Sequence, residues 1–163
     1  HKITNNSYKY ITVINIHDDY KKSENWKPAT IYKSDIKNDR CIIKANVNAT
    51  PVKIKKFEKI KMWEKVFATG NPEGNVGVMT PGSIQSKYPN GWFFEGGNNI
   101  RFEFSVPLVQ TNAKIRGGSS GGGLYDLNGY LIGITTLGDM DLTKANPMNV
   151  AISADQFMKL LKQ

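Results

Sequence analysis

Several residue types that stabilise small domains are scarce in this sequence. Its 163 residues include a single cysteine, Cys41, which excludes an internal disulfide. No CxxC or Cys/His cluster is present, so the spacing typical of a structural zinc site is missing. No apolar run reaches the roughly 18 residues of a membrane-spanning helix. With 39% hydrophobic and 22% charged residues, the chain is instead predicted to fold around an ordinary core.

Arginine and histidine are also rare. Only three of the 22 basic residues are arginines, although the formal net charge is +8. Nucleic-acid readers rely on the planar guanidinium, and lysine is a solvated point charge, so this composition argues against a nucleic-acid partner. The densest basic stretch, residues 53–65, alternates lysines with apolar residues. We interpret it as a half-buried segment with a solvated lysine face, and an electrostatic surface for an acidic partner is the alternative.

The apolar pattern predicts many short strands and one helix. Alternation recurs at residues 10–16, 30–32, 41–45, 52–54, 66–69, 82–85, 100–104, 122–125, 130–136 and 150–152, with turn signals between them. Even spacing of this kind indicates an all-β barrel or sandwich. Asn128-Gly129 predicts a type I′ hairpin turn. A capping-box pattern at residues 153–156 predicts the start of a C-terminal helix.

One glycine-rich segment carries the residues suited to catalysis. Residues 116–124 place Ser119 and Ser120 among five glycines, directly before the predicted hairpin. A serine nucleophile needs an exposed hydroxyl and converging backbone N–H groups that stabilise an oxyanion. A flexible loop or an anion-binding nest is the alternative. A P-loop is disfavoured because no Gly-Lys-Ser/Thr ending and no helical pattern follow.

A catalytic serine requires a base and an orienting carboxylate. The possible bases are His1 and His17, the two histidines of the chain. Asp39 precedes an apolar strand, so the order along the chain would be His, Asp, Ser. Taken singly, each of these residues is as readily structural or merely exposed.

Three ordered blocks resemble the HtrA/Deg-type trypsin-like serine proteases. Residues 109–124 are similar to the family's Q-T-D-A-x-I and G-N-S-G-G-x-L segment, and residues 128–136 to the N-G hairpin that ends L-I-G-I. Residues 68–84 resemble G-N-P-x-G followed by T-x-G-x-I, and residues 149–153 resemble F-A-I-P. Upstream, residues 38–43 match D-I-A-L-L more loosely.

The resemblance implies a role for each aligned residue. Ser120 aligns with the nucleophile, Asp39 with the triad aspartate and His1 with the triad histidine, and His17 is the rival base. The oxyanion hole would be formed by Gly118, Ser119 and Ser120. The residues expected to contact substrate are Lys114, Ile115, Thr135, Thr136 and Leu137.

The resemblance also implies a trypsin-like double β-barrel with a short C-terminal helix. Residues 1–58 would form the remainder of the first barrel, residues 59–152 the second barrel, and residues 153–163 the helix, together one protease domain. Because family members have strands before the histidine, we expect the first barrel to be incomplete in this chain. A missing N-terminal segment or a second chain would then complete it.

The function expected from the resemblance is a serine endopeptidase that acts on polypeptide substrates. No cofactor or metal is expected, and an extracytoplasmic location follows from family analogy alone. Lys114 lies where a trypsin-like pocket would hold an acid, so an uncharged aliphatic preference is expected. The alternatives are an inactive trypsin-like fold acting as a protein-binding module, and a module that binds anionic ligands.

Overall fold

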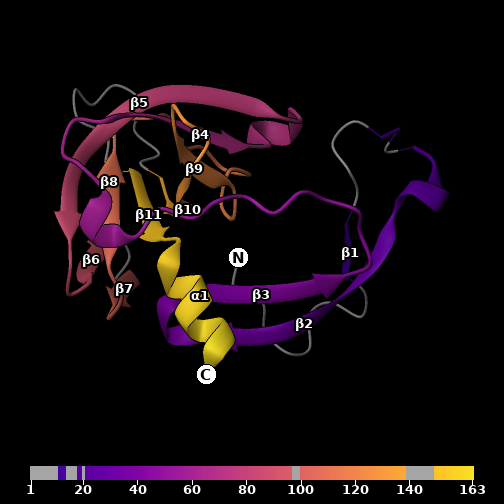
Figure 1. The fold of residues 1–163 in the computed structure, drawn as a ribbon, viewed down its shortest axis with the longest axis horizontal. Coiled ribbons are helices and arrows are strands. Elements are labelled where there is room, and N and C mark those ends of the chain that lie inside the picture. The colour runs from indigo at the N-terminus through magenta and orange to yellow at the C-terminus, as the bar shows by residue number, and fades with distance from the viewer. Residues whose placement is uncertain (1–10, 14–17, 20, 97–99, 139–148) are drawn as a thin grey trace. The chain divides into compact units, whose positions relative to one another are not determined.

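The computed structural model describes residues 11–13, 18–19, 21–96, 100–138 and 149–163. Chain order gives eleven strands, four 3-10 turns and one helix among these residues (Figure 1): β1 (Ile11–Val13), η1 (Ser23–Asn25), β2 (Lys27–Asp35), η2 (Ile36–Asn38), β3 (Arg40–Ala45), η3 (Phe57–Lys59), β4 (Lys65–Gly70), η4 (Pro72–Gly74), β5 (Val78–Tyr88), β6 (Trp92–Gly96), β7 (Ile100–Phe104), β8 (Leu108–Thr111), β9 (Gly123–Asp126), β10 (Leu131–Leu137), β11 (Asn149–Ser153) and α1 (Asp155–Lys162). The predicted all-β class with a short C-terminal helix is therefore confirmed.

The chain divides into two compact units, residues His1–Pro51 and Val52–Gln163. In the first unit, β1, β2 and β3 form a three-stranded antiparallel sheet. The pairing of β2 with β3 runs from Ala29 opposite Ala45 to Asp35 opposite Arg40, with one irregularity between Ile31 and Lys33. The short turn η2 joins these two strands.

The second unit is built on a closed six-stranded barrel in the order β10-β11-β8-β5-β4-β9. The long, curved β5 pairs with both β4 and β8, and the β6–β7 hairpin lies near one of its ends (Figure 1). The barrel interior is filled by aliphatic side chains that are fully buried, among them Ile84, Val109, Leu124 and Ile132. Burial of this many branched side chains supplies the main stabilisation of the barrel.

Residues 53–65 form a half-buried segment with a solvated lysine face, as the sequence predicts. Phe57 and Ile60 are buried in the barrel core, whereas Lys53, Lys56, Lys59, Lys61 and Lys65 are exposed. The predicted strand 52–54 is reduced to one parallel bridge between Ile54 and Leu131, closed by hydrogen bonds from the N–H of Lys55 and to the carbonyl of Lys53.

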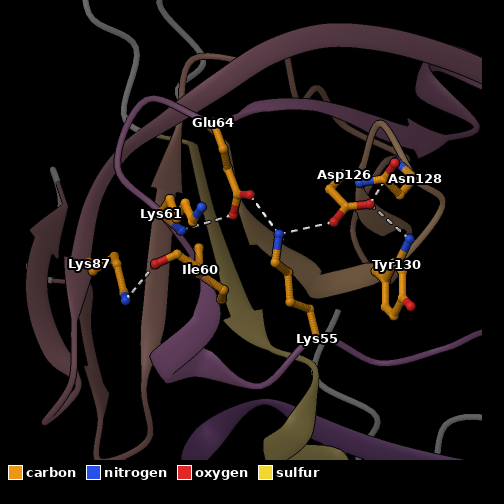
Figure 2. A network of polar contacts seen from close by, with 8 residues as sticks. All are labelled: Lys55, Ile60, Lys61, Glu64, Lys87, Asp126, Asn128 and Tyr130. Carbon is orange, nitrogen blue, oxygen red and sulfur yellow. Dashed lines mark hydrogen bonds and ion pairs between the residues drawn. The ribbon is translucent and has the colours of Figure 1, made fainter.

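Lys55 is the exception among these lysines, because its ammonium points inward. Nζ lies 2.6 Å from Glu64 Oε2 and 3.0 Å from Asp126 Oδ2, as Figure 2 shows. Asp126 begins the β9–β10 turn, so this one ammonium links residues 53–65 to the barrel hairpin. Nearby, Lys87 Nζ donates to the carbonyl of Ile60 at 2.8 Å (Figure 2) and lies 4.6 Å from the centre of the Phe57 ring.

The β9–β10 hairpin forms, but its turn is not type I′ as predicted. Gly129 has a φ of 78°, whereas Asn128 is outside the left-handed region that type I′ demands at both positions. The N–H of Asp126 bonds to the carbonyl of Tyr130, and the Asp126 carboxylate accepts from the N–H groups of Asn128 and Tyr130. The carboxylate thus favours a three-residue loop with glycine in the left-handed position.

The predicted capping box at the C-terminal helix is also wrong. The N-cap is Ala154, which makes no side-chain cap, and Ser153 is the last residue of β11. Strand pairing holds the Ser153 N–H against the carbonyl of Pro107 at 3.0 Å, and the Ser153 hydroxyl donates to Asp155 Oδ1. Because Ser153 belongs to the strand, the N-cap is Ala154, one residue later than the capping-box pattern predicts.

Candidate active site

The predicted nucleophile segment begins with a tight turn at residues 116–119. The N–H of Ser119 bonds to the carbonyl of Arg116 at 2.9 Å, which closes the turn. Gly118 occupies its third position with a φ of 94°, and Gly117 lies outside the left-handed region. A positive φ at the third position alone defines a type II turn. A Cβ on Gly118 would lie 2.5 Å from the carbonyl oxygen of Asn71, so only glycine fits.

The two serines after this turn lie in opposite environments. Ser119 is 5% exposed and packs against Gly70. The contact is close, because a Cβ added to Gly70 would lie 2.8 Å from the Cα of Ser119. Its carbonyl accepts from the N–H of Gly122 at 2.9 Å and from Thr135 Oγ1 at 2.6 Å. Ser120 is exposed, and its Oγ lies 3.4 Å from the carbonyl oxygen of Thr136. Of the two hydroxyls, Ser120 Oγ is the one presented to solvent.

The amide groups around Ser120 differ in the same way. The Ser119 N–H is used inside the turn, whereas the N–H groups of Gly118 and Ser120 donate to no acceptor among the residues the structure describes. Both residues are exposed. Two unengaged N–H groups beside an exposed hydroxyl are what an oxyanion hole requires. In this conformation Ser119 contributes by closing the turn.

The predicted substrate-contact residues occupy two neighbouring segments of the second unit. Thr135 is 1% exposed and Ile115 is 2% exposed, so neither side chain reaches the surface. Thr136 is nearly buried and Leu137 is half-buried, whereas Lys114 is exposed and its carbonyl accepts from Thr80 Oγ1 at 2.7 Å. The segments approach closely beyond Leu137, since a Cβ on Gly138 would lie 2.6 Å from the carbonyl oxygen of Ile115.

Thr135 connects the nucleophile segment to β10. Its backbone accepts from the N–H of Gly121 at 2.8 Å and donates to the carbonyl of Gly122 at 2.9 Å. Its hydroxyl donates to the carbonyls of Ser119 and Gly122. Thr135 therefore anchors the nucleophile segment to β10 through both its backbone and its hydroxyl.

Asp39 lies in the first unit, at the tip of the β2–β3 turn. It is exposed, adopts the left-handed conformation with φ 50° and ψ 41°, and its N–H bonds to the carbonyl of Ile36. Asp39 and Ser120 thus belong to different units. His1 and His17 lie outside the described residues.

The turn that carries Asp39 is fixed by a neighbouring ion pair. Arg40 is 7% exposed and its guanidinium binds Asp35, whose carboxylate also accepts from the N–H and side-chain amide of Asn38. Burial alone would raise the pKa of Asp35, but the hydrogen bonds from Arg40 and Asn38 outweigh it and hold the pKa below its usual 3.8. Arg40 therefore serves the turn, which explains a charged residue directly after Asp39.

A residue that the sequence reasoning missed lies against the nucleophile turn. The N–H of Glu73, in η4, donates to the carbonyl of Gly117 at 3.1 Å, and its carboxylate lies 3.5 Å from Arg116. The motif G-N-P-x-G was recognised, but its x position gave no sign of this contact.

Within the described part of the chain, no group of three or more His, Cys, Asp or Glu side chains could hold a metal ion. No helix in that part is long and apolar enough to span a membrane.

Residues 4–134 match the family described as trypsin-like peptidase domain. The chain belongs to this family. The trypsin-like peptidase match covers the nucleophile segment and the whole first sheet, and so confirms the resemblance seen in the sequence.

The trypsin-like domain is similar to curated DegP-like proteases. The chain is 30% identical over 138 residues to a "Probable periplasmic serine endoprotease DegP-like" of Ectopseudomonas mendocina (strain ymp), covering 80% of this chain and 27% of the relative. It is 33% identical over 136 residues to a protein of the same description from Pseudomonas fulva (strain 12-X), covering 78% and 26%. The chain thus spans about a quarter of these relatives.

Solved structures confirm the trypsin-like fold. The HtrA-type protease AlgW, solved with a tripeptide, superposes with a TM-score of 0.72 over 94% of this chain and 47% of that one, at 23% identity. An active-form protease of M. tuberculosis gives a TM-score of 0.66 over 86% of this chain and 60% of that one, at 21% identity. At these identities the likeness concerns the fold.

Proposed function

We propose that this trypsin-like domain is a serine endopeptidase that hydrolyses peptide bonds through an acyl-enzyme. Ser120 Oγ attacks the scissile carbonyl, and His1 takes its proton and later returns it to the leaving amine. Asp39 orients His1 and stabilises its charged form. The N–H groups of Gly118 and Ser120 donate to the oxyanion as it develops.

The surroundings of Ser120 are the main support for this proposal. Ser120 presents an exposed hydroxyl beside two unengaged N–H groups, in a chain that belongs to the trypsin-like peptidase family. The buried, turn-closing Ser119 is unsuited to attack a substrate. The left-handed conformation at the tip of the β2–β3 turn exposes the Asp39 carboxylate, which supports its assignment.

We place the substrate strand along β10 beyond Thr135, whose own N–H and carbonyl bond to Gly122 and Gly121. The pairing of β9 with β10 ends at Ile134, and no further strand among those described follows on that edge. An extended peptide pairs readily with such an edge. The carbonyl of Thr136, already near Ser120 Oγ, would accept from the substrate backbone. The backbone of Lys114 and Ile115 would wall the adjoining pocket for an uncharged aliphatic side chain.

We also propose the arrangement of the domain and the cellular location of the protein from its likeness to trypsin-like relatives. Residues 1–58 would contribute strands to a first barrel, residues 59–152 would form the second, and residues 153–163 would contribute the C-terminal helix. The relatives from Ectopseudomonas and Pseudomonas are described as periplasmic, which favours an extracytoplasmic location for this protein too. Fractionation of the cells that make it would test this.

Hydrolysis of an unfolded protein such as reduced casein tests the activity. We expect the natural full-length protein to release peptides, and Ser120→Ala, Asp39→Asn and His1→Ala to reduce the rate by at least about a thousandfold. Ser119→Ala is the matched control, because it removes a hydroxyl one residue away. If the wild-type protein binds casein but releases no peptide, the domain is a binding module and not a protease.

A further inference from the structure

The direction of the Gly118 N–H depends on one peptide plane. The peptide between Gly117 and Gly118 is the central peptide of the turn at residues 116–119. Type II and type I turns share the same closing hydrogen bond and differ by a rotation of about 180° of this central peptide. In a trans peptide the C=O and N–H point in opposite directions. Whatever holds the Gly117 carbonyl therefore sets where the Gly118 N–H points.

Glu73 holds that carbonyl. Its N–H donates to Gly117 O at 3.1 Å, and its carboxylate lies 3.5 Å from the guanidinium of Arg116, one residue earlier in the turn. Glu73 thus contacts the nucleophile turn twice, through the backbone and through the side chain. Gly118 packs against the same loop, since a Cβ added to it would lie 2.5 Å from the carbonyl oxygen of Asn71.

The conformation of Glu73 is itself unusual. Its φ of 55° and ψ of 27° place a non-glycine residue in the left-handed region, which persists where surrounding structure enforces it. The enforcing contacts are local: Asn71 Oδ1 accepts from the N–H of Gly77 at 2.9 Å, and the carbonyl of Pro72 accepts from the N–H of Asn75 at 2.9 Å. The loop is therefore built to present the Glu73 N–H to Gly117.

We propose that Glu73 is a positioning residue for the oxyanion hole. It selects the type II form of the turn and so keeps the Gly118 N–H pointing away from η4, available to the oxyanion. Its catalytic consequence rests on the proposed function, but its effect on the peptide plane does not. Without the Glu73 contact, the turn can relax to type I, and the Gly118 N–H is withdrawn while Ser120 keeps its place.

Three substitutions at Glu73 separate the backbone contact from the carboxylate. Glu73→Pro removes the N–H and, because proline cannot adopt a φ of 55°, also removes the left-handed conformation that presents it. We therefore expect kcat to fall about a hundredfold, as when one oxyanion donor is lost, with KM changed far less. Glu73→Gly keeps the N–H in a conformation that glycine adopts freely, and Glu73→Gln removes only the charge. Because the Arg116 contact is an exposed ion pair, each of these should reduce kcat by no more than about fivefold. Glu58→Gln, in the exposed part of η3, is the charge-matched control.

Proton NMR of the glycine-labelled protein reads the peptide plane directly. A type II turn brings the Gly117 Hα close to the Gly118 amide proton, whereas a type I turn separates them. We expect a strong cross-peak in the wild-type protein and in Glu73→Gly, and its loss in Glu73→Pro. Retention of the peak in Glu73→Pro overturns the inference. Should Glu73→Pro fail to fold, semisynthetic protein with the α-hydroxy-acid analogue of glutamate at position 73 replaces it, because an ester oxygen then stands where the N–H was and the left-handed φ is still allowed. Loss of the cross-peak in the ester supports positioning, and an unchanged peak contradicts it.

The two proposals fail in different ways. If the wild-type protein shows the type II cross-peak, dependent on Glu73, but hydrolyses no substrate, the positioning inference stands and the protease assignment falls. If the wild-type protein is active and Glu73→Pro matches it in kcat, the protease assignment stands and the positioning inference falls.

Discussion

The hydroxyl of Thr135 donates a 2.6 Å hydrogen bond to the carbonyl of Ser119, the residue directly before Ser120. Thr135 lies in β10 and is 1% exposed, so the rigid barrel wall holds the nucleophile segment from inside the protein. A reactive group supported in this way loses little conformational entropy when a substrate binds.

Replacing Thr135 by valine preserves shape and removes this bond. Because the carbonyls of Ser119 and Gly122 each keep one other donor, we expect Thr135→Val to lower the free energy of unfolding by about 1 kcal/mol, near the lower end for a lost buried hydrogen bond. The rate of Ser120 acylation should fall more than substrate binding. Urea unfolding and pre-steady-state kinetics measure the two effects. Thr30→Val, at an exposed position of β2, should leave both unchanged.

Two adjacent glycines should respond differently to alanine. Gly118→Ala places a Cβ 2.5 Å from the Asn71 carbonyl at a φ of 94°, so we expect it to cost about 1–3 kcal/mol in stability and to abolish peptide hydrolysis. Gly117→Ala meets nothing within 4 Å and has no positive φ, so it should fold with nearly wild-type stability. Equal urea midpoints for the two variants would show that the turn is not held as described.

The ammonium of Lys55 should contribute more to the free energy of unfolding than that of any exposed lysine nearby. Lys55→Met leaves the carboxylates of Glu64 and Asp126, with side chains 14% and 6% exposed, without their cation. Removing one partner of a buried ion pair typically costs about 3–5 kcal/mol, and we expect the lower part of that range because Asp126 keeps two backbone donors. Lys59→Met, on the exposed face, is the control and should change stability by less than about 0.5 kcal/mol.

The same three residues predict how stability varies with pH. Burial would raise the pKa of Asp126, but hydrogen bonds from Lys55, Tyr130 and Asn128 outweigh it and hold the pKa below 3.8. Burial would lower the pKa of Lys55, but its bonds to Glu64 and Asp126 raise it above 10.5. The Asp126 contribution is therefore complete above about pH 4 and lost as the pH falls through its folded pKa, and the Lys55 contribution is lost only as the pH rises beyond 10.5.

Unfolding free energies measured from pH 2 to 11 test this. The wild-type protein should lose stability at the acid end faster than Lys55→Met, so that the two curves converge there. Parallel curves down to pH 2 would mean that Asp126 is not stabilised by Lys55.

Local patterns in the sequence predicted the features that depend on neighbouring residues. The glycine-rich segment indicated an exposed serine because few other sequences allow a type II turn followed by close backbone packing, as Gly118 and Gly122 show. The β9–β10 hairpin was likewise predicted, although its turn type depended on the Asp126 carboxylate and not on Asn128-Gly129 alone. The capping-box pattern misled because strand pairing at Ser153 outweighed it.

Features that depend on distant residues could not be predicted in the same way. Lys55 binds Asp126 across 71 positions of the chain, and nothing in residues 53–65 singled out this lysine from its neighbours. Trp63 is one of the apolar residues that alternate with lysines in residues 53–65, but the turn at residues 61–64 gives it a φ of 65° and leaves it 66% exposed. The contact of Glu73 with Gly117 depends on two loops that meet only in the folded barrel.

Mass spectrometry after treatment with a fluorophosphonate tests the identity of the nucleophile most directly. The reagent phosphonylates a serine that is activated by a base and an oxyanion hole, and peptide mapping then locates the adduct. We predict a single adduct on Ser120 of the full-length protein, retained in Ser119→Ala and absent from Ser120→Ala. An unmodified wild-type protein, or an adduct on Ser119, would contradict the assignment of Ser120 as the catalytic nucleophile.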